Sequence, residues 1–542
     1  MTSGRLISQA GDIPEALDAA LREPAIYPHP VAKIEVEETH ISKVFLTGLF
    51  VYKVKKPVDF GFLDFSTLEK RRHWCEQELL LNQRLSQGVY LEVVSITKEP
   101  LGFALNGSGE PVEYAVKMRQ LPRERSMGEL CRRGQATVGM VEDLARVLAT
   151  FYGDARSGPE VDAMGSQGAV EAVTEENFTQ TEPFVPDLLP RDRFLFIRDA
   201  VRNFLRRHGQ LFQRRVDTGR VRDGHGDLRL DHVYFVNGIQ IIDCIEFNER
   251  FRCGDVAADL AFLAMDLDLV GREDLGWNLI RAYAHGAWDP EVWVLLDFYK
   301  CYRAYVRCKV ECLRLSEGGM TEAHQALTEK RARREFNLAH DYAATFSRPT
   351  LWVICGLSGS GKSTIADHLA NCLRLPVHRS DAVRKRLFRS PSGEATVAAF
   401  GEGIYTPAAT EKTYDSLLSE AREDLASGGS AIVDATFAQR THRERARKLA
   451  RDKGAAIVVV ECISHDAVIR RRLSKREGRK VLSDARPQHF ASQRLAFEPV
   501  TEMDDDQYIR VRTDQPLIHS MEQLFSLAYL CQVRQARKAT EK

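Results

Sequence analysis

The run Gly356-Leu-Ser-Gly-Ser-Gly-Lys-Ser363 constrains this chain more than any other feature, because it fits the GxxxxGK(S/T) pattern of a phosphate-binding loop. It follows a continuous apolar run, Leu351–Cys355, typical of a buried parallel strand, and it precedes a helix-like segment, TIADHLANCL. Glycines let backbone N–H groups close around phosphate oxygens, and the helix N-terminus adds its positive end. We therefore expect an ATP site in which Lys362 reaches the β- and γ-phosphates and Ser363 binds Mg²⁺. The other expected loop contacts are Gly356, Ser358, Gly359, Ser360, Gly361 and Thr364.

The rest of the C-terminal part alternates short apolar runs with helix-like segments. The apolar runs are LWVIC, PVHRS, AIVDAT and AIVVVEC. Such alternation predicts βαβ units and a parallel sheet, and hence an α/β P-loop NTPase domain over residues 350–542. A domain boundary is expected at Phe346–Thr350 (FSRPT), because a helical stretch rich in Arg, Glu and Ala, from Trp288 to about Thr345, ends just before it.

Two acidic residues follow predicted strands of this domain. Asp381 lies in the run SDAVR after the second strand, and Asp434 ends AIVDAT. Together with the loop, these motifs resemble the small P-loop kinases of the gluconate kinase, zeta toxin and chloramphenicol phosphotransferase type, over residues 351 to about 501. The resemblance implies that Asp381 orients or deprotonates an acceptor hydroxyl and that Asp434 holds Mg²⁺ through water. The structural alternatives are a helix N-cap for Asp381 and an ordinary polar strand end for Asp434.

A basic run, Arg470–Arg476, lies further along the same domain. It is similar to the lid of these kinases, which implies that Arg472 and Arg476 close over the transferring phosphoryl group. Guanidinium groups suit this task because charge develops on the equatorial phosphate oxygens. A solvated helix face is the alternative interpretation of the run.

The N-terminal part has a different pattern. Val44–Val54 and Ala115–Leu121 are expected to be strands, and residues 68–86 between them are strongly helical in pattern. A mostly helical region follows. This order predicts a two-lobed α+β body over residues 1–346.

A second constellation lies within this body, where His225-Gly-Asp227 precedes His232 and the apolar run that ends at Asp243. It resembles the catalytic loop HGDxxxxN and the metal-binding Asp of the aminoglycoside phosphotransferase and choline kinase group, a protein-kinase-like fold. The resemblance implies that Asp227 accepts or orients the proton of the acceptor hydroxyl and that Asp243 bridges Mg²⁺ to the phosphates. The segment GDVAADLA, which begins at Gly254, is similar to a structural segment of the same group.

This group also has a Lys–Glu ion pair in its first lobe. Lys53 and Lys55 share one strand face, and we expect Lys53 to bind phosphate, with Lys55 as the alternative. Glu78 fits the pattern ExxxxxxL of this group better than Glu76 does, so the resemblance implies that Glu78 is the partner.

His232 departs from this group, which usually has Asn there. Imidazole is a softer ligand than an amide oxygen, so Mn²⁺ is a possible metal at this site beside Mg²⁺. The departure is also compatible with a pseudokinase that regulates the P-loop domain.

Composition limits the partners of the chain. Of 542 residues, 76 are Lys or Arg and 76 are Asp or Glu, so a polyanion-binding role for the whole molecule is not indicated. The eleven cysteines form no CxxC pair, which suits a reducing cytosol. No secretory signal and no bilayer-spanning run is apparent, so we expect a cytoplasmic protein without a membrane partner. The sequence does not indicate an oligomeric state.

The fused pair resembles bacterial bifunctional proteins in which a phosphotransferase domain precedes an ATP-binding domain. This resemblance implies a small-molecule kinase with two nucleotide sites, which transfers the γ-phosphoryl group of ATP to a hydroxyl. A nucleic-acid-end kinase remains the alternative, because Lys and Arg outnumber Asp and Glu after Thr350. It is not favoured, because no pattern of interleaved aromatic and basic residues is present.

Overall fold

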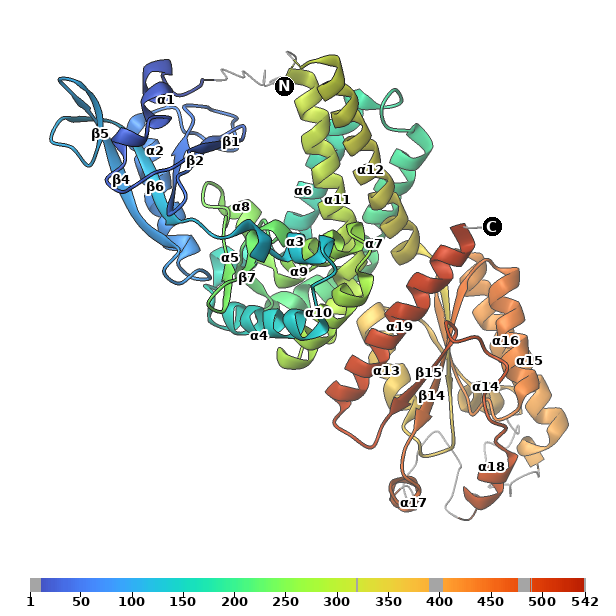
Figure 1. The fold of residues 1–542 in the computed structure, drawn as a ribbon. Coiled ribbons are helices and arrows are strands. Elements are labelled where there is room, and N and C mark those ends of the chain that lie inside the picture. The colour runs from blue at the N-terminus through green and yellow to red at the C-terminus, as the bar shows by residue number, and fades with distance from the viewer. Residues whose placement is uncertain (1–10, 318–319, 389–402, 476–487, 489, 541–542) are drawn as a thin grey trace. The chain divides into compact units, whose positions relative to one another are not determined.

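The computed structural model describes residues 11–317, 320–388, 403–475, 488 and 490–540 (Figure 1). The chain divides into two compact units. The N-terminal unit comprises Met1–Phe184, Phe212–Tyr283 and Arg303–Glu335. The C-terminal unit comprises Val185–Leu211, Ala284–Tyr302 and Phe336–Lys542. Three stretches that precede Thr350 therefore group with the P-loop region.

The first lobe of the N-terminal unit is a six-stranded antiparallel sheet with the order β1-β2-β3-β6-β4-β5. The predicted strand Val44–Val54 is a hairpin that turns at Thr47-Gly48, where Gly48 has a φ of 93°. The second predicted strand, Ala115–Leu121, overlaps β6 but extends two residues past its end. The six strands are β1 (Glu35–Glu38), β2 (Ser42–Leu46), β3 (Phe50–Lys55), β4 (Tyr90–Glu99), β5 (Gly102–Leu105) and β6 (Glu110–Arg119).

Strand β3 separates two small cores. Tyr52 and Val54 face helix α1 (Glu15–Leu21), whereas Val51 faces helix α2 (Leu68–Asn82). Because side chains alternate along a strand, Lys53 and Lys55 lie on the same face as Val51, toward α2.

The second lobe is mainly helical, and two short antiparallel ladders, β7 with β10 and β8 with β9, carry its loops. The ladder strands are β7 (Val221–Asp223), β8 (Val233–Phe235), β9 (Ile239–Ile241) and β10 (Cys253–Asp255). The helices with residues in this lobe are α3 (Met127–Arg132), α4 (Val138–Asp154), α5 (Pro159–Met164), α6 (Gln167–Thr181), α7 (Arg191–Asp217), α8 (Glu249–Arg252), α9 (Val256–Leu269), α10 (Glu273–Gly286), α11 (Val292–Glu317) and α12 (Glu322–Ser347). The single helical stretch expected after Trp288 is thus two helices, and α7 is kinked at His208.

A buried ion pair anchors α9 in the second lobe. Arg215 Nη2 lies 2.7 Å from Asp255 Oδ1, and each side chain is 1% exposed. Asp255 is also the N-cap of α9, because its carboxylate accepts the N–H of Ala257.

We expect Asp255→Ala to lower the free energy of unfolding of the N-terminal unit by about 3–5 kcal/mol, since it leaves Arg215 buried without its partner carboxylate. Urea unfolding measures this change. The matched control is Asp143→Ala in the exposed pair with Arg146, for which we expect about 1 kcal/mol or less. Equal decreases in the free energy of unfolding for the two substitutions would contradict a stabilising role for the buried pair of Arg215 and Asp255.

The C-terminal unit contains a five-stranded parallel sheet with the order β12-β13-β11-β14-β15. Four strands match the predicted apolar runs, and the fifth, β15, was not predicted. The strands are β11 (Thr350–Cys355), β12 (Val377–Arg379), β13 (Ala431–Asp434), β14 (Ala456–Ile463) and β15 (Tyr508–Arg512).

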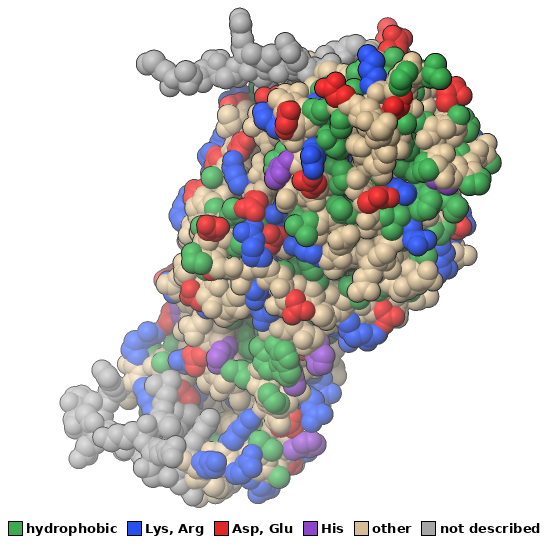
Figure 2. Space-filling model, turned by 90° about the vertical axis from the view of Figure 1, so that its left-hand side faces the viewer, with side chains coloured by type: hydrophobic (Ala, Val, Ile, Leu, Met, Phe, Trp, Pro, Cys, Tyr) green, Lys and Arg blue, Asp and Glu red, His purple; other side chains and the backbone are tan. Residues whose placement is uncertain are grey.

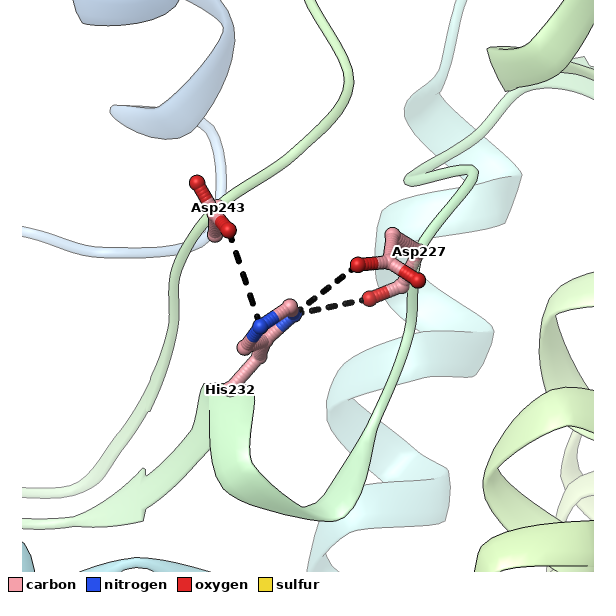
Figure 3. A group of neighbouring side chains, drawn as sticks. All are labelled: Asp227, His232 and Asp243. Carbon is pink, nitrogen blue, oxygen red and sulfur yellow. Dashed lines mark hydrogen bonds and ion pairs between the residues drawn. The ribbon is translucent and has the colours of Figure 1, made fainter. Parts of the chain in front are cut away.

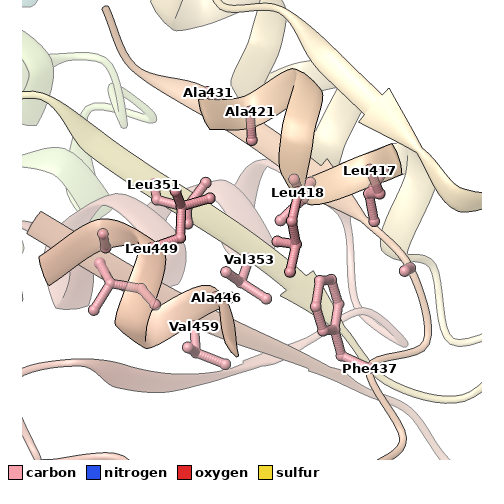
Figure 4. Packing of buried hydrophobic residues seen from close by; sticks show 14 of the residues in the cluster. Leu351, Val353, Leu417, Leu418, Ala421, Ala431, Phe437, Ala446, Leu449 and Val459 are labelled. Atoms are coloured by element: carbon pink, nitrogen blue, oxygen red, sulfur yellow. The ribbon is translucent and has the colours of Figure 1, made fainter. Parts of the chain in front are cut away.

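One face of this sheet packs on α15 and α16. Leu351 and Val353 of β11 meet Leu417 of α15 and Leu449 of α16 in a buried apolar cluster (Figure 4). Trp352 points to the other face, where it lines a cavity with residues of α19. The helices of this region are α13 (Lys362–Leu373), α14 (Ser380–Leu387), α15 (Pro407–Ala426), α16 (Arg440–Asp452), α17 (Asp466–Ser474), α18 (Phe490–Ala496) and α19 (Leu517–Thr540).

The predicted fold class, a two-lobed α+β kinase-like body followed by an α/β P-loop domain with a parallel sheet, is therefore confirmed. Within the described ranges, none of the helices is both long enough and apolar enough to cross a lipid bilayer.

Candidate functional site

Two lysines of β3 share one glutamate of α2. Lys53 Nζ lies 2.8 Å from Glu78 Oε1, and Lys55 Nζ lies 2.7 Å from Glu78 Oε2. Lys53 also lies 2.7 Å from Asp243 Oδ1, whereas Lys55 pairs with Glu246. Of the two lysines, Lys53 is therefore the one that reaches the predicted metal-binding carboxylate. The alternative partner, Glu76, is exposed and pairs with Arg72 instead.

These charges stabilise one another. Burial opposes the charge of Lys53, but the carboxylates of Asp243 and Glu78 raise the pKa of Lys53 well above its usual value. Desolvation favours the neutral form of Asp243, yet the Lys53 ammonium lowers the pKa of Asp243. Both groups are charged at neutral pH, so Lys53 presents a fixed cation that an incoming phosphate can share.

The loop that carries Asp227 is held by a neutral histidine and a buried aspartate. His225 Nε2 lies 3.0 Å from the carbonyl oxygen of Ile242, which can only accept, so Nε2 carries the proton and Nδ1 accepts the N–H of Asp227. Burial lowers the pKa of His225 to about 4, which keeps the ring neutral. Asp259 accepts the backbone N–H groups of His225 and Gly226 at 2.7 and 2.9 Å. Asp259, in the segment GDVAADLA, thus supports the loop, as expected.

Asp227, His232 and Asp243 lie close enough to share a metal ion (Figure 3). One ligand atom from each falls within 4.8 Å of the others. His232 Nδ1 donates to the Asp227 carbonyl oxygen at 2.9 Å, so Nε2, 3.6 Å from Asp243 Oδ2, is the nitrogen that could ligate. One imidazole and two carboxylates fit Mn²⁺ at least as well as Mg²⁺. Asp243 has a φ of 63°, an uncommon value for a residue other than glycine.

Two residues of this site were not predicted from the sequence. Glu246 is the second carboxylate that pairs with Lys55. The only indication of Glu246 in the sequence was its position, three residues after Asp243. Arg229 lies two positions after Asp227, and its Nε is buried without a hydrogen-bond partner among the described residues. Burial opposes the charge of Arg229, but Asp227 and Asp266 raise its pKa. The only indication of Arg229 in the sequence was its position inside the catalytic-loop motif.

The phosphate-binding loop follows β11 and depends on three glycines. Gly356, Gly359 and Gly361 have φ values of 129°, 83° and 95°, which side chains disfavour. A Cβ on Gly361 would also lie 3.0 Å from Thr513, and one on Gly356 would lie 2.6 Å from a backbone oxygen. Of the polar loop residues, Ser358 is half-buried, Ser360 is buried and Thr364 lines an adjacent cavity.

The cation and carboxylates of this site gather at the carboxyl ends of β11, β12 and β13. Lys362 Nζ donates to the carbonyl oxygen of Leu357 at 2.8 Å, and the Ser363 hydroxyl bonds to the Asp434 carboxylate. Burial raises the pKa of Asp434, while the Lys362 charge opposes this shift. Asp381, in the first turn of α14, is near enough for its charge to act on Asp434.

Arg472 of α17 contacts the loop directly. Its guanidinium donates to the Gly359 carbonyl oxygen at 3.4 Å and to the Thr513 carbonyl oxygen at 2.5 Å. Arg472, Lys475 and Gln515 line a cavity of about 420 Å³ beside the loop, which is large enough for part of a nucleotide. Arg476 lies outside the described residues.

Comparison with known proteins places the chain in a family. An AAA domain model matches residues 351–500. The chain is 34% identical over 454 residues to the uncharacterized protein Mb2027c of Mycobacterium bovis, covering 83% of this chain and 88% of that protein. The uncharacterized protein Rv2004c of Mycobacterium tuberculosis matches to the same extent.

Solved structures match each part separately. A choline/ethanolamine kinase family protein from Mesorhizobium loti is 14% identical, with a TM-score of 0.37, covering 60% of this chain and 99% of that one. A kinase described as putative from Chloroflexus aurantiacus is 21% identical, with a TM-score of 0.28, covering 33% and 96%. The identity of 34% over 454 residues shows that the chain belongs to the family of the mycobacterial proteins, and its residues 351–500 match an AAA domain.

Proposed function

We propose that this protein is an ATP-dependent phosphotransferase with two nucleotide sites, which transfers the γ-phosphoryl group to a hydroxyl of a small molecule. One observation carries the proposal: each unit contains a lysine that lies beside carboxylates of the same unit. These are Lys53 with Asp243 and Asp227 in the N-terminal unit, and Lys362 with Asp434 and Asp381 in the C-terminal unit.

In the N-terminal unit, Lys53 would bind the α- and β-phosphates while Glu78 fixes its position. Asp227 would accept the proton of the acceptor hydroxyl as that oxygen bonds to the γ-phosphorus and the bond to the ADP oxygen breaks. The tight support of its loop by His225 and Asp259 keeps the Asp227 carboxylate in place.

In the C-terminal unit, the loop amides and Lys362 would hold the phosphates, and Asp381 would orient or deprotonate the acceptor. Arg472 would contribute positive charge next to the loop. A bound divalent cation supplies neutralisation of phosphate charge in both units; its ligands would be Asp243 and His232 in one and Ser363 with Asp434 in the other.

The charge distribution supports a small acceptor over a nucleic acid. Basic and acidic side chains are equal in number over the whole chain, 76 of each, and Figure 2 shows them interspersed over the upper part of the visible face, whereas nucleic-acid-binding proteins carry an excess of basic residues.

ATP consumption across a library of sugars, nucleosides, aminoglycosides and short RNA ends tests the proposal. A signal that depends on one small hydroxyl compound, and that is weakened little by salt, is expected. A signal that depends on RNA ends and falls steeply with salt would replace the small acceptor by a nucleic acid.

One observation favours a second function for the N-terminal unit. His232 stands where the related kinases have Asn, so this unit could bind nucleotide and regulate the P-loop unit without transferring phosphate. An Asp227→Ala variant with unchanged phosphotransferase activity would support that alternative.

We expect His232→Asn to change the metal preference of the N-terminal unit. Asn replaces a nitrogen ligand by a hard amide oxygen, so Mn²⁺ affinity should fall about tenfold or more relative to Mg²⁺. Electron paramagnetic resonance of added Mn²⁺ measures this binding without any turnover. An unchanged ratio of Mn²⁺ to Mg²⁺ affinity would exclude His232 as a ligand.

A further inference from the structure

The C-terminal unit has a second cavity, at the end of its sheet opposite the phosphate-binding loop. The cavity is about 310 Å³, and its lining includes Thr350, Pro376 and Ser430, which lie at the start of β11 or directly before β12 and β13. The phosphate-binding loop follows the other end of β11. At about 3.3 Å per residue, the six residues of β11 separate the two places by roughly 20 Å. A ligand here would therefore not overlap the nucleotide.

Part of the wall of this cavity is aromatic. Phe204 and Phe346 lie 5.3 Å apart between ring centroids, and Trp293 lies 5.2 Å from Tyr529. Trp352 of β11 is a further lining residue. Such a wall offers a flat, apolar surface to a ring or a similar group.

Three arginines, Arg207, Arg348 and Arg374, also line the cavity. None of the ion pairs found among the described residues involves any of the three. Two of them donate hydrogen bonds to neutral acceptors: Arg348 Nη1 donates to the Gln535 carbonyl oxygen at 2.7 Å, and Arg374 Nη1 donates to Gln210 Oε1 at 2.6 Å. Partial burial lowers the pKa of Arg348, with no carboxylate acting on it. Arg348 is half-buried, whereas Arg207 and Arg374 are exposed. Guanidinium groups without a carboxylate partner favour an anion from outside the chain.

The two carboxylates in the lining do not supply that anion. Asp297 accepts the Tyr529 hydroxyl at 2.7 Å, and Asp424 lies 2.6 Å from His378 Nε2. Each carboxylate is thus already bonded to a neighbour other than the three arginines.

We propose that this cavity binds a small organic anion, a carboxylate or phosphate carried on a flat apolar group. The arginines would bind the charged end, and the aromatic wall would bind the apolar body. The volume lies within the range of about 300–1,000 Å³ found for small-molecule sites. This inference goes beyond the proposed phosphotransferase activity and does not depend on it.

The test uses three compounds of similar shape and different charge: phenyl phosphate, benzyl alcohol and benzylamine. Each is titrated into the full-length chain saturated with Mg·ADP, which fills the nucleotide sites. Calorimetry measures binding, and fluorescence adds a local signal because Trp293 and Trp352 are two of only five tryptophans. We expect phenyl phosphate to bind, benzyl alcohol to bind at least tenfold more weakly, and benzylamine not to bind.

Matched variants locate the binding. Arg348→Gln should weaken phenyl phosphate binding about tenfold or more, since it removes a charge-assisted bond. Arg207→Gln tests the same site with an exposed residue that can be changed without harm to the fold. Arg206→Gln is the control, because Arg206 is also exposed, is bonded to Asn203 and is not among the residues that line the cavity. The proposal would be overturned if phenyl phosphate did not bind or if benzylamine bound equally well. It would also be overturned if the Arg207 and Arg206 variants had equal affinities for phenyl phosphate.

Discussion

Replacing Lys362 by alanine is expected to lower ATP turnover by the C-terminal unit at least about 100-fold, because it removes the cation at the centre of the phosphate-binding loop. Removal of the Lys362 charge has two consequences for the site. Lys362 would no longer neutralise phosphate charge, and it would no longer oppose the rise in the pKa of the buried Asp434. A protonated Asp434 is a poorer ligand for a divalent cation, so metal binding by this unit should weaken as well.

The matched control for this substitution is Lys448→Ala, which changes an exposed lysine of α16 in the same unit. ATP hydrolysis and transfer, measured for both variants beside wild type, should separate them clearly. Activity that depends on Asp227 should survive in the Lys362 variant. Loss of both activities together, with folding retained, would contradict independent sites and require that the two sites be coupled.

The second large effect is expected for Asp227→Ala, which should reduce transfer by the N-terminal unit about 10²- to 10⁴-fold. Asp227 is the carboxylate that we propose to receive the proton of the acceptor hydroxyl, and its neighbour Arg229 cannot accept a proton. Nucleotide affinity should change little, because Lys53, Glu78 and Asp243 stay in place.

Asp231→Ala provides the control, since Asp231 lies four positions further along the same segment and is exposed. Steady-state transfer and nucleotide binding are measured for both variants. If Asp227→Ala lost nucleotide affinity and turnover equally, the residue would be a structural support of the site instead of the group that receives the proton.

Local motifs made much of this structure predictable. The phosphate-binding loop and four strands of its sheet were recognisable because each is a contiguous pattern. Strand β15 was not, because YIRVR alternates apolar and charged residues at a sheet edge and has no motif beside it. The pairing of Glu78 with β3 was predicted from the resemblance to a kinase group with a known Lys–Glu pair, whereas the contact of Lys55 with Glu246 joins residues 191 positions apart and no motif indicated it.

The assignment of distant segments to one compact unit was harder to predict than the motifs. The first part of α7 and the first part of α11 belong with the P-loop unit, although both precede Thr350 by many residues. Both helices have the ordinary apolar periodicity of an amphipathic helix. This periodicity shows which face of the helix is buried, but it does not show which part of the protein that face packs against. The cavity lined by Phe204, Trp293 and Arg348 depends on that grouping, so it has no signal in the sequence alone.

The central claim is that one chain carries two separate nucleotide sites, and the stoichiometry of nucleotide binding tests it most directly. Calorimetric titration with a non-hydrolysable ATP analogue and Mg²⁺ should give two sites per chain for wild type. Lys362→Ala and Lys53→Ala should each leave one site, and the double variant should leave none. A single site in wild type, or a folded Lys362→Ala variant that binds no nucleotide, would contradict the account.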